Sequence, residues 1–133
     1  MLFSAEERTR KRILKKFRKS GIAIPCSDGV IIDEKAEIGT GTVILPGTII
    51  KEGCRIGKNC TIGPNTVLYK TRIGDDCILN NVQAEEAVIK NSVTAGPFVH
   101  LRPASVLEDG VHCGNFVEVK NSGIGEKTHI SHL

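Results

Sequence analysis

Two cations at a fixed separation are the clearest chemical signal in the sequence. Arg102 and Lys120 are separated by 18 residues. If the chain repeats with that period, both side chains stand on one face of neighbouring strands, where like charges repel. An anion such as a phosphate group would relieve the repulsion. Neutralisation by Glu118, a carboxylate on the same face, is the alternative explanation.

One histidine near the end of the sequence could act as a base. His132 is followed by the last residue, Leu133. A free imidazole has a pKa of about 6.5 and can take a proton from an amine near neutral pH. A solvated side chain is the alternative for this histidine. His100, His112 and His129 show no comparable pattern, and we expect them on the surface or at an interface.

The cysteines do not show the spacing of a metal site. The chain has five cysteines and no CxxC pair, so the sequence predicts no zinc site. Without an export signal, free thiols in a reducing cytoplasm are expected. Cys60 and Cys77 are 17 residues apart, and we expect them to pack as free thiols in neighbouring coils.

Basic charge is concentrated at one end of the chain. Residues 1–29 hold eight Lys and Arg, all between Arg8 and Lys19, whereas the rest of the chain has ten basic and twelve acidic residues. No aromatic stacking platform accompanies the basic run, which favours a solvated helix face over a nucleic-acid interface. No apolar run is long enough to cross a membrane. We expect a cytoplasmic protein that binds neither nucleic acid nor membranes.

Aliphatic residues recur with a period of six over most of the sequence. The first series is Ile32, Ile38, Ile44, Ile50, Ile56, Ile62 and Leu68. After a slip of one residue it continues through Ile73, Leu79, Ala84, Ile89, Ala95, Leu101, Leu107, Cys113, Val119, Ile124 and Ile130. Glycine often follows these positions by one residue and proline by two. Such a repeat predicts hexads, each formed by a short strand and a corner.

Three hexads form a triangular coil, and stacked coils pair as parallel strands about 4.8 Å apart. We therefore predict an all-β fold, a left-handed parallel β-helix of hexapeptide repeats with a short N-terminal α-helix. An antiparallel sandwich would show a period of two and hairpin turns. Residues 1–24 should form a basic helix and connection, and residues 25–133 about five and a half coils. Residues 80–94 fit the register only through two five-residue steps, at Ala84 and Ile89.

The N-terminal helix is expected to cover the open end of the β-helix. Ser4 and Glu7 match a capping box, and Gly21 is a suitable stop. Leu14 and Phe17 form its short apolar stripe. On the coils, outward apolar residues need cover from another molecule. We place Ile49, Val67 and Val99 among them, and we expect Asn115 and Phe116 to turn and pack.

Residues 96–133 carry motifs in a specific order. They contain a GPF segment followed by LRP, then GNFVE-x-K, then a His-Leu pair. This order and spacing resemble the C-terminal acetyltransferase domain of the bacterial bifunctional N-acetylglucosamine-1-phosphate uridyltransferase/glucosamine-1-phosphate N-acetyltransferase. The likeness extends weakly back to about residue 5. No uridyltransferase domain accompanies it in this sequence.

The resemblance implies a site and its ligands. In that family, the residues matching Arg102 and Lys120 hold the sugar phosphate, and the residue matching His132 is the general base. Acetyl-CoA would be the co-substrate, and a homotrimer would place ligand sites between subunits. The family's further coils, which supply a tyrosine, an asparagine, a lysine and most of the acetyl-CoA surface, are expected to be missing.

Two functions therefore remain open. The first is a hexapeptide-repeat acyltransferase related to glucosamine-1-phosphate N-acetyltransferase, which supplies the cell-wall precursor UDP-N-acetylglucosamine. The second is a catalytically inactive β-helix that acts as a trimeric scaffold or weak sugar-phosphate binder. In either case we expect the last coil to fray or to stack end to end on another molecule. Stacking would bury Ile130 and Leu133 and place His132 at the junction.

Overall fold

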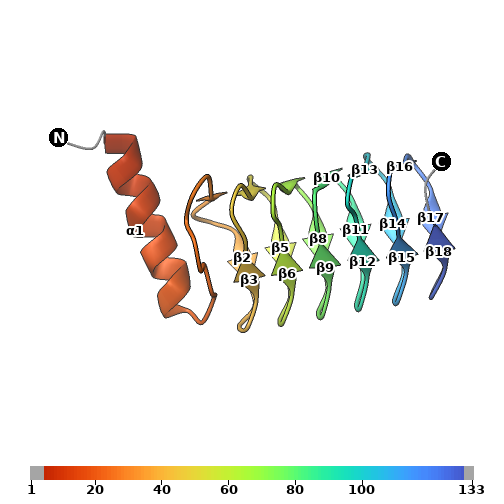
Figure 1. Ribbon diagram of the computed structural model, residues 1–133, viewed down its shortest axis with the longest axis horizontal. Coiled ribbons are helices and arrows are strands. Elements are labelled where there is room, and N and C mark those ends of the chain that lie inside the picture. The colour runs from red at the N-terminus through yellow and green to blue at the C-terminus, as the bar shows by residue number, and fades with distance from the viewer. Residues whose placement is uncertain (1–4, 131–133) are drawn as a thin grey trace.

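The computed structural model describes residues 5–130, which form one helix followed by a β-helix (Figure 1). Helix α1 spans Ala5–Lys19. The strands are β1 (Ile31–Ile32), β2 (Glu37–Ile38), β3 (Val43–Ile44), β4 (Ile49–Ile50), β5 (Arg55–Ile56), β6 (Thr61–Ile62), β7 (Val67–Tyr69), β8 (Arg72–Ile73), β9 (Ile78–Leu79), β10 (Val82–Glu85), β11 (Val88–Ile89), β12 (Thr94–Ala95), β13 (Val99–Leu101), β14 (Val106–Leu107), β15 (His112–Cys113), β16 (Val117–Val119), β17 (Gly123–Ile124) and β18 (His129–Ile130). No helix in the described range is long and apolar enough to cross a membrane.

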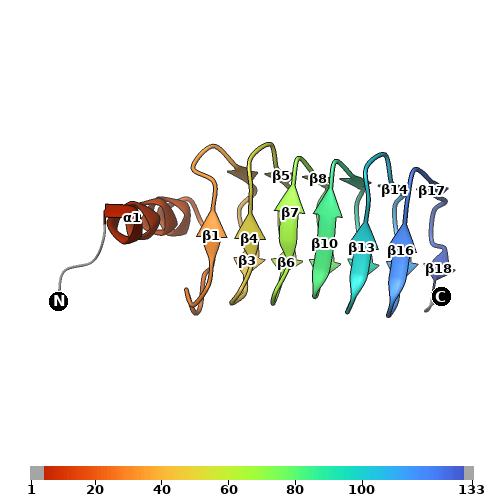
Figure 2. The ribbon, with the colours of Figure 1, turned by 90° about the horizontal axis from the view of Figure 1, so that it is seen from above.

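Every third strand belongs to the same parallel sheet. The three sheets have the orders β1-β4-β7-β10-β13-β16, β2-β5-β8-β11-β14-β17 and β3-β6-β9-β12-β15-β18. Figure 2 shows the β1 sheet in front with its strands running upward, while the coils advance to the right and the chain passes to the back at the top. This is a left-handed winding. The predicted left-handed parallel β-helix with a short N-terminal helix is confirmed.

The difficult register in residues 80–94 is also confirmed. Ala84 pairs with Leu68 on one side and Leu101 on the other, and Ile89 pairs with Ile73 and Leu107 in the same way. Each sheet has six strands in the described residues, which makes six coils rather than five and a half. Four of the steps between core positions are five residues long, so more coils fit into the same length. The division of the chain into residues 1–24 and 25–133 stays a prediction.

Inward side chains form the core, and a second inward row lies two residues before them. Leu68, Leu101 and Leu107 are completely buried, as are Thr66 and Thr71 of the second row. The expectation that Val99 points outward is wrong, because it is only 3% exposed. Residues two apart in a strand share a face, so Val99 points inward with Leu101, and His100 between them points outward.

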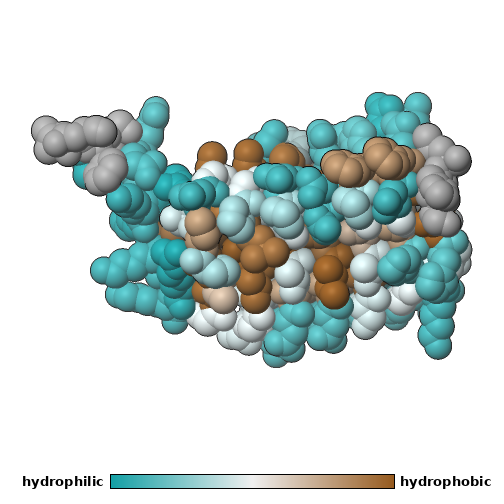
Figure 3. Space-filling view, viewed as in Figure 1, coloured by the Kyte–Doolittle hydropathy of each residue, from teal (hydrophilic) through white to brown (hydrophobic). Residues whose placement is uncertain are grey.

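Helix α1 packs against the first coil, as Figure 1 shows. Its apolar residues Leu14 and Phe17 are buried. Arg10 Nε donates a hydrogen bond to the Val30 carbonyl oxygen at 2.8 Å, and Arg12 forms an ion pair with Glu34 at 2.8 Å. Part of the N-terminal basic charge therefore attaches the helix to the coil. Hydrophilic side chains cover this end, whereas apolar ones gather along the coils (Figure 3).

One corner position has a left-handed backbone in every coil. Just before each strand of the β1 sheet, φ lies between +50° and +75°. The six residues at this corner are Gly29, Gly47, Asn65, Asn81, Phe98 and Phe116. Glycine adopts such angles freely and asparagine readily, but a bulky aromatic residue rarely does. The last two coils therefore carry phenylalanine at a position where the fold favours other residues.

Candidate functional site

The sequence-predicted cations lie at the C-terminal half of the β1 sheet. Leu101 on β13 pairs with Val119 on β16, so Arg102 and Lys120, which directly follow them, occupy equivalent places in consecutive coils. The Arg102 amide donates to the Val119 carbonyl oxygen at 2.8 Å. The chain thus brings together the two residues that the 18-residue spacing singled out.

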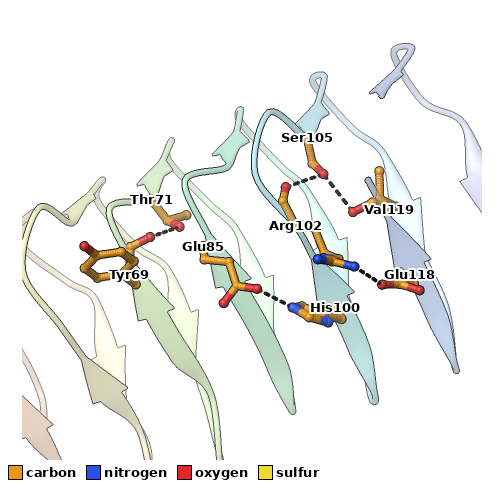
Figure 4. A network of polar contacts seen from close by, with 8 residues as sticks. All are labelled: Tyr69, Thr71, Glu85, His100, Arg102, Ser105, Glu118 and Val119. Atoms are coloured by element: carbon orange, nitrogen blue, oxygen red, sulfur yellow. Dashed lines mark hydrogen bonds and ion pairs between the residues drawn. The ribbon is translucent and has the colours of Figure 1, made fainter. Parts of the chain in front are cut away.

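Two diagonal polar contacts cross this part of the sheet (Figure 4). His100 Nε2 lies 2.6 Å from Glu85 Oε1, and Arg102 Nη1 lies 3.4 Å from Glu118 Oε2. The Arg102 and Glu118 side chains are 42% and 52% exposed, so solvent screens their attraction and the pair is weak. Glu118 therefore neutralises Arg102 in part, as the alternative explanation supposed. Within residues 5–130, no ion pair forms at the exposed Lys120 ammonium.

Ser105 fixes the backbone beneath Arg102. Its hydroxyl lies 2.6 Å from the Arg102 carbonyl oxygen and 2.8 Å from the Val119 carbonyl oxygen, as Figure 4 shows. Ser105 is 1% exposed and belongs to the second inward row. A buried hydroxyl that contacts both coils holds Arg102 in place without touching its side chain.

An open groove of about 550 Å³ runs along the same sheet. Phe98 and Phe116 lie at one edge, with ring centroids 5.2 Å apart and planes nearly parallel. They are 54% and 60% exposed. His100 and Glu118 line the groove beside them. Sequence reasoning placed Phe116 in a turn, which is confirmed, but missed the aromatic pair, although these phenylalanines have the same 18-residue spacing as the cations.

The proposed base cannot be placed with these groups. His132 lies outside the described residues, as does Leu133, so the role of His132 and the stacking of the last coil stay predictions. Within residues 5–130, no group of three or more His, Cys, Asp or Glu side chains gathers as a metal cluster would.

The cysteines are all free, as expected, and Cys26 is exposed whereas Cys54, Cys60, Cys77 and Cys113 are buried. Burial raises the pKa of Cys113 to about 11. A hydrogen bond between Cys60 and Cys77 raises the pKa of Cys77, as does burial. The same hydrogen bond lowers the pKa of Cys60 to about 7, although burial opposes it. These thiols lie inside the coils and not in the groove.

The comparisons with known proteins agree with the motifs. The model of the GMPPB C-terminal domain family matches residues 26–124. The bifunctional protein GlmU of Streptococcus agalactiae serotype V is 39% identical over 132 residues, 99% of this chain and 29% of the relative. GlmU of Streptococcus pyogenes serotype M28 is 47% identical over the same shares. The resemblance to this family is confirmed, and the chain spans less than a third of the length of these curated relatives.

Solved structures share the fold. A putative acetyltransferase of Bacillus cereus superposes with a TM-score of 0.66 at 18% identity, over 85% of this chain and 67% of that one. A mutant perosamine N-acetyltransferase of Caulobacter crescentus, in complex with CoA and GDP-perosamine, has a TM-score of 0.59 at 15% identity, over 92% of this chain and 58% of that one. At such low identity the likeness shows the fold alone.

Proposed function

The chain belongs to the GMPPB C-terminal domain family, and from this premise we propose that it forms the acceptor-binding part of an amino-sugar N-acetyltransferase. The acceptor is glucosamine 1-phosphate or a closely related amino-sugar phosphate. This substrate follows from the resemblance to the glucosamine-1-phosphate N-acetyltransferase domain.

One observation supports this proposal most strongly. Arg102 and Lys120 occupy equivalent places in consecutive coils, beside the Leu101–Val119 pair. A phosphate oxygen between them would accept hydrogen bonds from both, and charge-assisted hydrogen bonds to phosphate are among the strongest in proteins. Glu118 is held only weakly at 3.4 Å from Arg102, so a phosphate can displace it from the guanidinium.

The groove is connected to Arg102 through Glu118, which lines it and contacts the guanidinium, and it suits the rest of an amino sugar. A hexose has apolar ring faces and a rim of hydroxyl groups, and the groove offers exposed aromatic rings together with the polar side chains of His100 and Glu118. We assign the phosphate to Arg102 and Lys120 and the sugar ring to the adjoining groove. The acceptor nitrogen would lose its proton to a base as it is acetylated, and the resemblance assigns this role to His132.

Acetyl-CoA is the acetyl donor that the resemblance implies. When bound, it supplies a thioester whose acetyl group passes to the amine. Coenzyme A carries several phosphate groups, whereas Arg102 and Lys120 together match one. These residues therefore suit the acceptor and not the donor, and we assign no described residue to acetyl-CoA.

We extend the proposal to a homotrimer. Ile31 and Ile78 are 50% and 49% exposed, which is high for large apolar side chains, and covering them would be favourable. The resemblance also implies subunits packed about a threefold axis. Size-exclusion chromatography with light scattering should give three times the chain mass, and a monomer at micromolar concentration would refute this part of the proposal.

Calorimetric titration of the whole chain tests the phosphate site. Glucosamine 1-phosphate should bind, and unphosphorylated glucosamine should bind much more weakly. Arg102→Gln and Lys120→Gln should each lower the affinity for glucosamine 1-phosphate by about tenfold or more, because each removes a charged hydrogen bond. Arg72→Gln is the matched control, since Arg72 is an exposed arginine on β8 in another sheet.

The outcomes separate the two functions. Binding of the sugar phosphate together with formation of its N-acetyl product from acetyl-CoA, detected by mass spectrometry, supports the enzyme. Binding without product supports the alternative of a non-catalytic sugar-phosphate binder. Equal affinity of all three variants would contradict the assignment of Arg102 and Lys120.

A further inference from the structure

Two histidines face outward side by side on the last two strands of the β3 sheet. His112 on β15 pairs in register with His129 on β18. Their ring centroids are 5.2 Å apart, and the ring planes are inclined by 31°. Both side chains are exposed. Imidazole nitrogens are ligands for zinc, copper and nickel ions, so the fold presents two such ligands on adjacent, hydrogen-bonded strands.

In the part of the chain that the structure describes, these two rings have no polar partners. Among residues 5–130, neither imidazole forms a hydrogen bond or an ion pair, which contrasts with His100 and its carboxylate partner Glu85. The outward residues that precede the pair on the same sheet are uncharged. They are Val43, Thr61, Ile78 and Thr94. No carboxylate from these positions therefore competes for the rings.

We propose that His112 and His129 form a surface site for a divalent first-row transition-metal ion. Each imidazole would supply one nitrogen, and water would complete the coordination shell. The backbone pairing of β15 with β18 holds both ligands in place, so the second nitrogen binds at a high effective concentration once the first is bound. The site is independent of the acceptor site proposed above.

Such a bridge would have a structural consequence. The ion would connect β18, the last described strand, to β15 in the coil before it. His112 N already donates to the Thr128 carbonyl oxygen at 2.7 Å, and the metal would add a second link between these coils. A ligand that binds only the ordered coil stabilises it, so metal binding should protect the amides of residues 123–130.

Nickel titration of the whole chain tests the site. We would use nickel chloride and a Cys26→Ser background, since Cys26 is the exposed thiol. His112→Asn and His129→Asn should each weaken nickel binding by about tenfold or more, because the remaining imidazole has lost its chelating partner, and the double variant should bind most weakly. His100→Asn is the matched control and should keep the parent affinity.

A second readout guards against variants that fold poorly. In the parent chain, saturating nickel should slow hydrogen exchange in residues 123–130 by about tenfold or more, and it should have no such effect in His112→Asn. Binding should also weaken as the pH falls, because protonated imidazole cannot coordinate a metal. Unchanged nickel affinity in either single variant, or a double variant that binds nickel as tightly as the parent, would overturn the proposal.

Discussion

The two halves of the β1 sheet share a backbone arrangement but differ in what they present to solvent. In β1, β4 and β7 the outward residues are Ile31, Ile49 and Val67. In β10, β13 and β16 the equivalent residues are Gln83, His100 and Glu118. The inward residues stay apolar throughout. They are Ile32, Ile50, Leu68, Ala84, Leu101 and Val119.

This contrast shows which residues specify the coil and which are free to carry chemistry. The inward rows must fill a narrow prism, so they vary little in kind along the chain. The outward row is not constrained by the core, and it changes from apolar side chains to an amide, an imidazole and a carboxylate. Substitutions at inward and at outward positions of one sheet should therefore change the free energy of unfolding by very different amounts.

The largest effect should come from the inward row. Leu101→Ala removes a completely buried side chain and should lower the free energy of unfolding by roughly 2–5 kcal/mol. Gln83→Ala, at an exposed outward position of the same sheet, should change it by less than about 0.5 kcal/mol. Urea denaturation of both variants measures the difference. Similar losses would show that the two rows do not differ as described.

The second effect concerns the hydroxyl beneath the cations. Ser105→Ala removes a buried hydroxyl that can donate to one of two carbonyl oxygens at a time, and because both oxygens keep backbone N–H donors, it should lower the free energy of unfolding by about 1–2 kcal/mol. Ser122→Ala is the control, because its exposed hydroxyl contacts only the Lys120 carbonyl oxygen. Thermal unfolding should separate the two variants. If Ser105→Ala also lowers the affinity for sugar phosphate, Ser105 positions Arg102 as well as stabilising the coil.

The third effect is at the corner that differs between the halves. Gly47 has a φ of +75°, and a Cβ there would lie 2.2 Å from Asn65 Oδ1. Gly47→Ala should therefore lower the free energy of unfolding by about 1–2 kcal/mol, because alanine disfavours the left-handed backbone and its Cβ forces Asn65 to shift. Gly125→Ala is the control, since its Cβ would meet nothing closer than 3.9 Å. Equal melting temperatures of the two variants would contradict this explanation of the corner.

Much of the fold could be predicted because the repeat acts locally. The core series placed even the five-residue steps at Ala84 and Ile89 correctly, since aliphatic spacing directly sets which residues point inward. Val99 was misplaced because the series tracked one inward row, and the residue two positions before it also points inward. The spacing of Arg102 and Lys120 predicted their proximity in the same way.

Other features of the site could not be predicted from spacing. The pairing of His100 with Glu85 is diagonal across two strands and depends on side-chain conformation. The stack of Phe98 on Phe116 could have been predicted from their 18-residue separation, but Phe116 was expected only to turn and pack, and Phe98 was not singled out. Their left-handed backbone depends on the corner geometry and not on residue type.

The smallest effect concerns the buried thiols. The pKa of Cys113 rises to about 11 in the folded chain from 9.0, so folding favours its protonated form. The resulting stability is fully present below pH 9 and is lost as the pH rises towards 11. Native alkylation near pH 8 should modify Cys26 first, and denaturation should expose all five thiols. Rapid modification of Cys113 in the native chain would contradict its burial.

A double-substitution cycle tests the central claim most directly. The affinity for glucosamine 1-phosphate would be measured for the parent chain, Arg102→Gln, Lys120→Gln and the double variant. If both cations bind one phosphate, each single change weakens binding by about tenfold or more, and the double variant loses less than the sum of the two losses. Losses that add independently, or no loss in either single variant, would contradict a shared phosphate site.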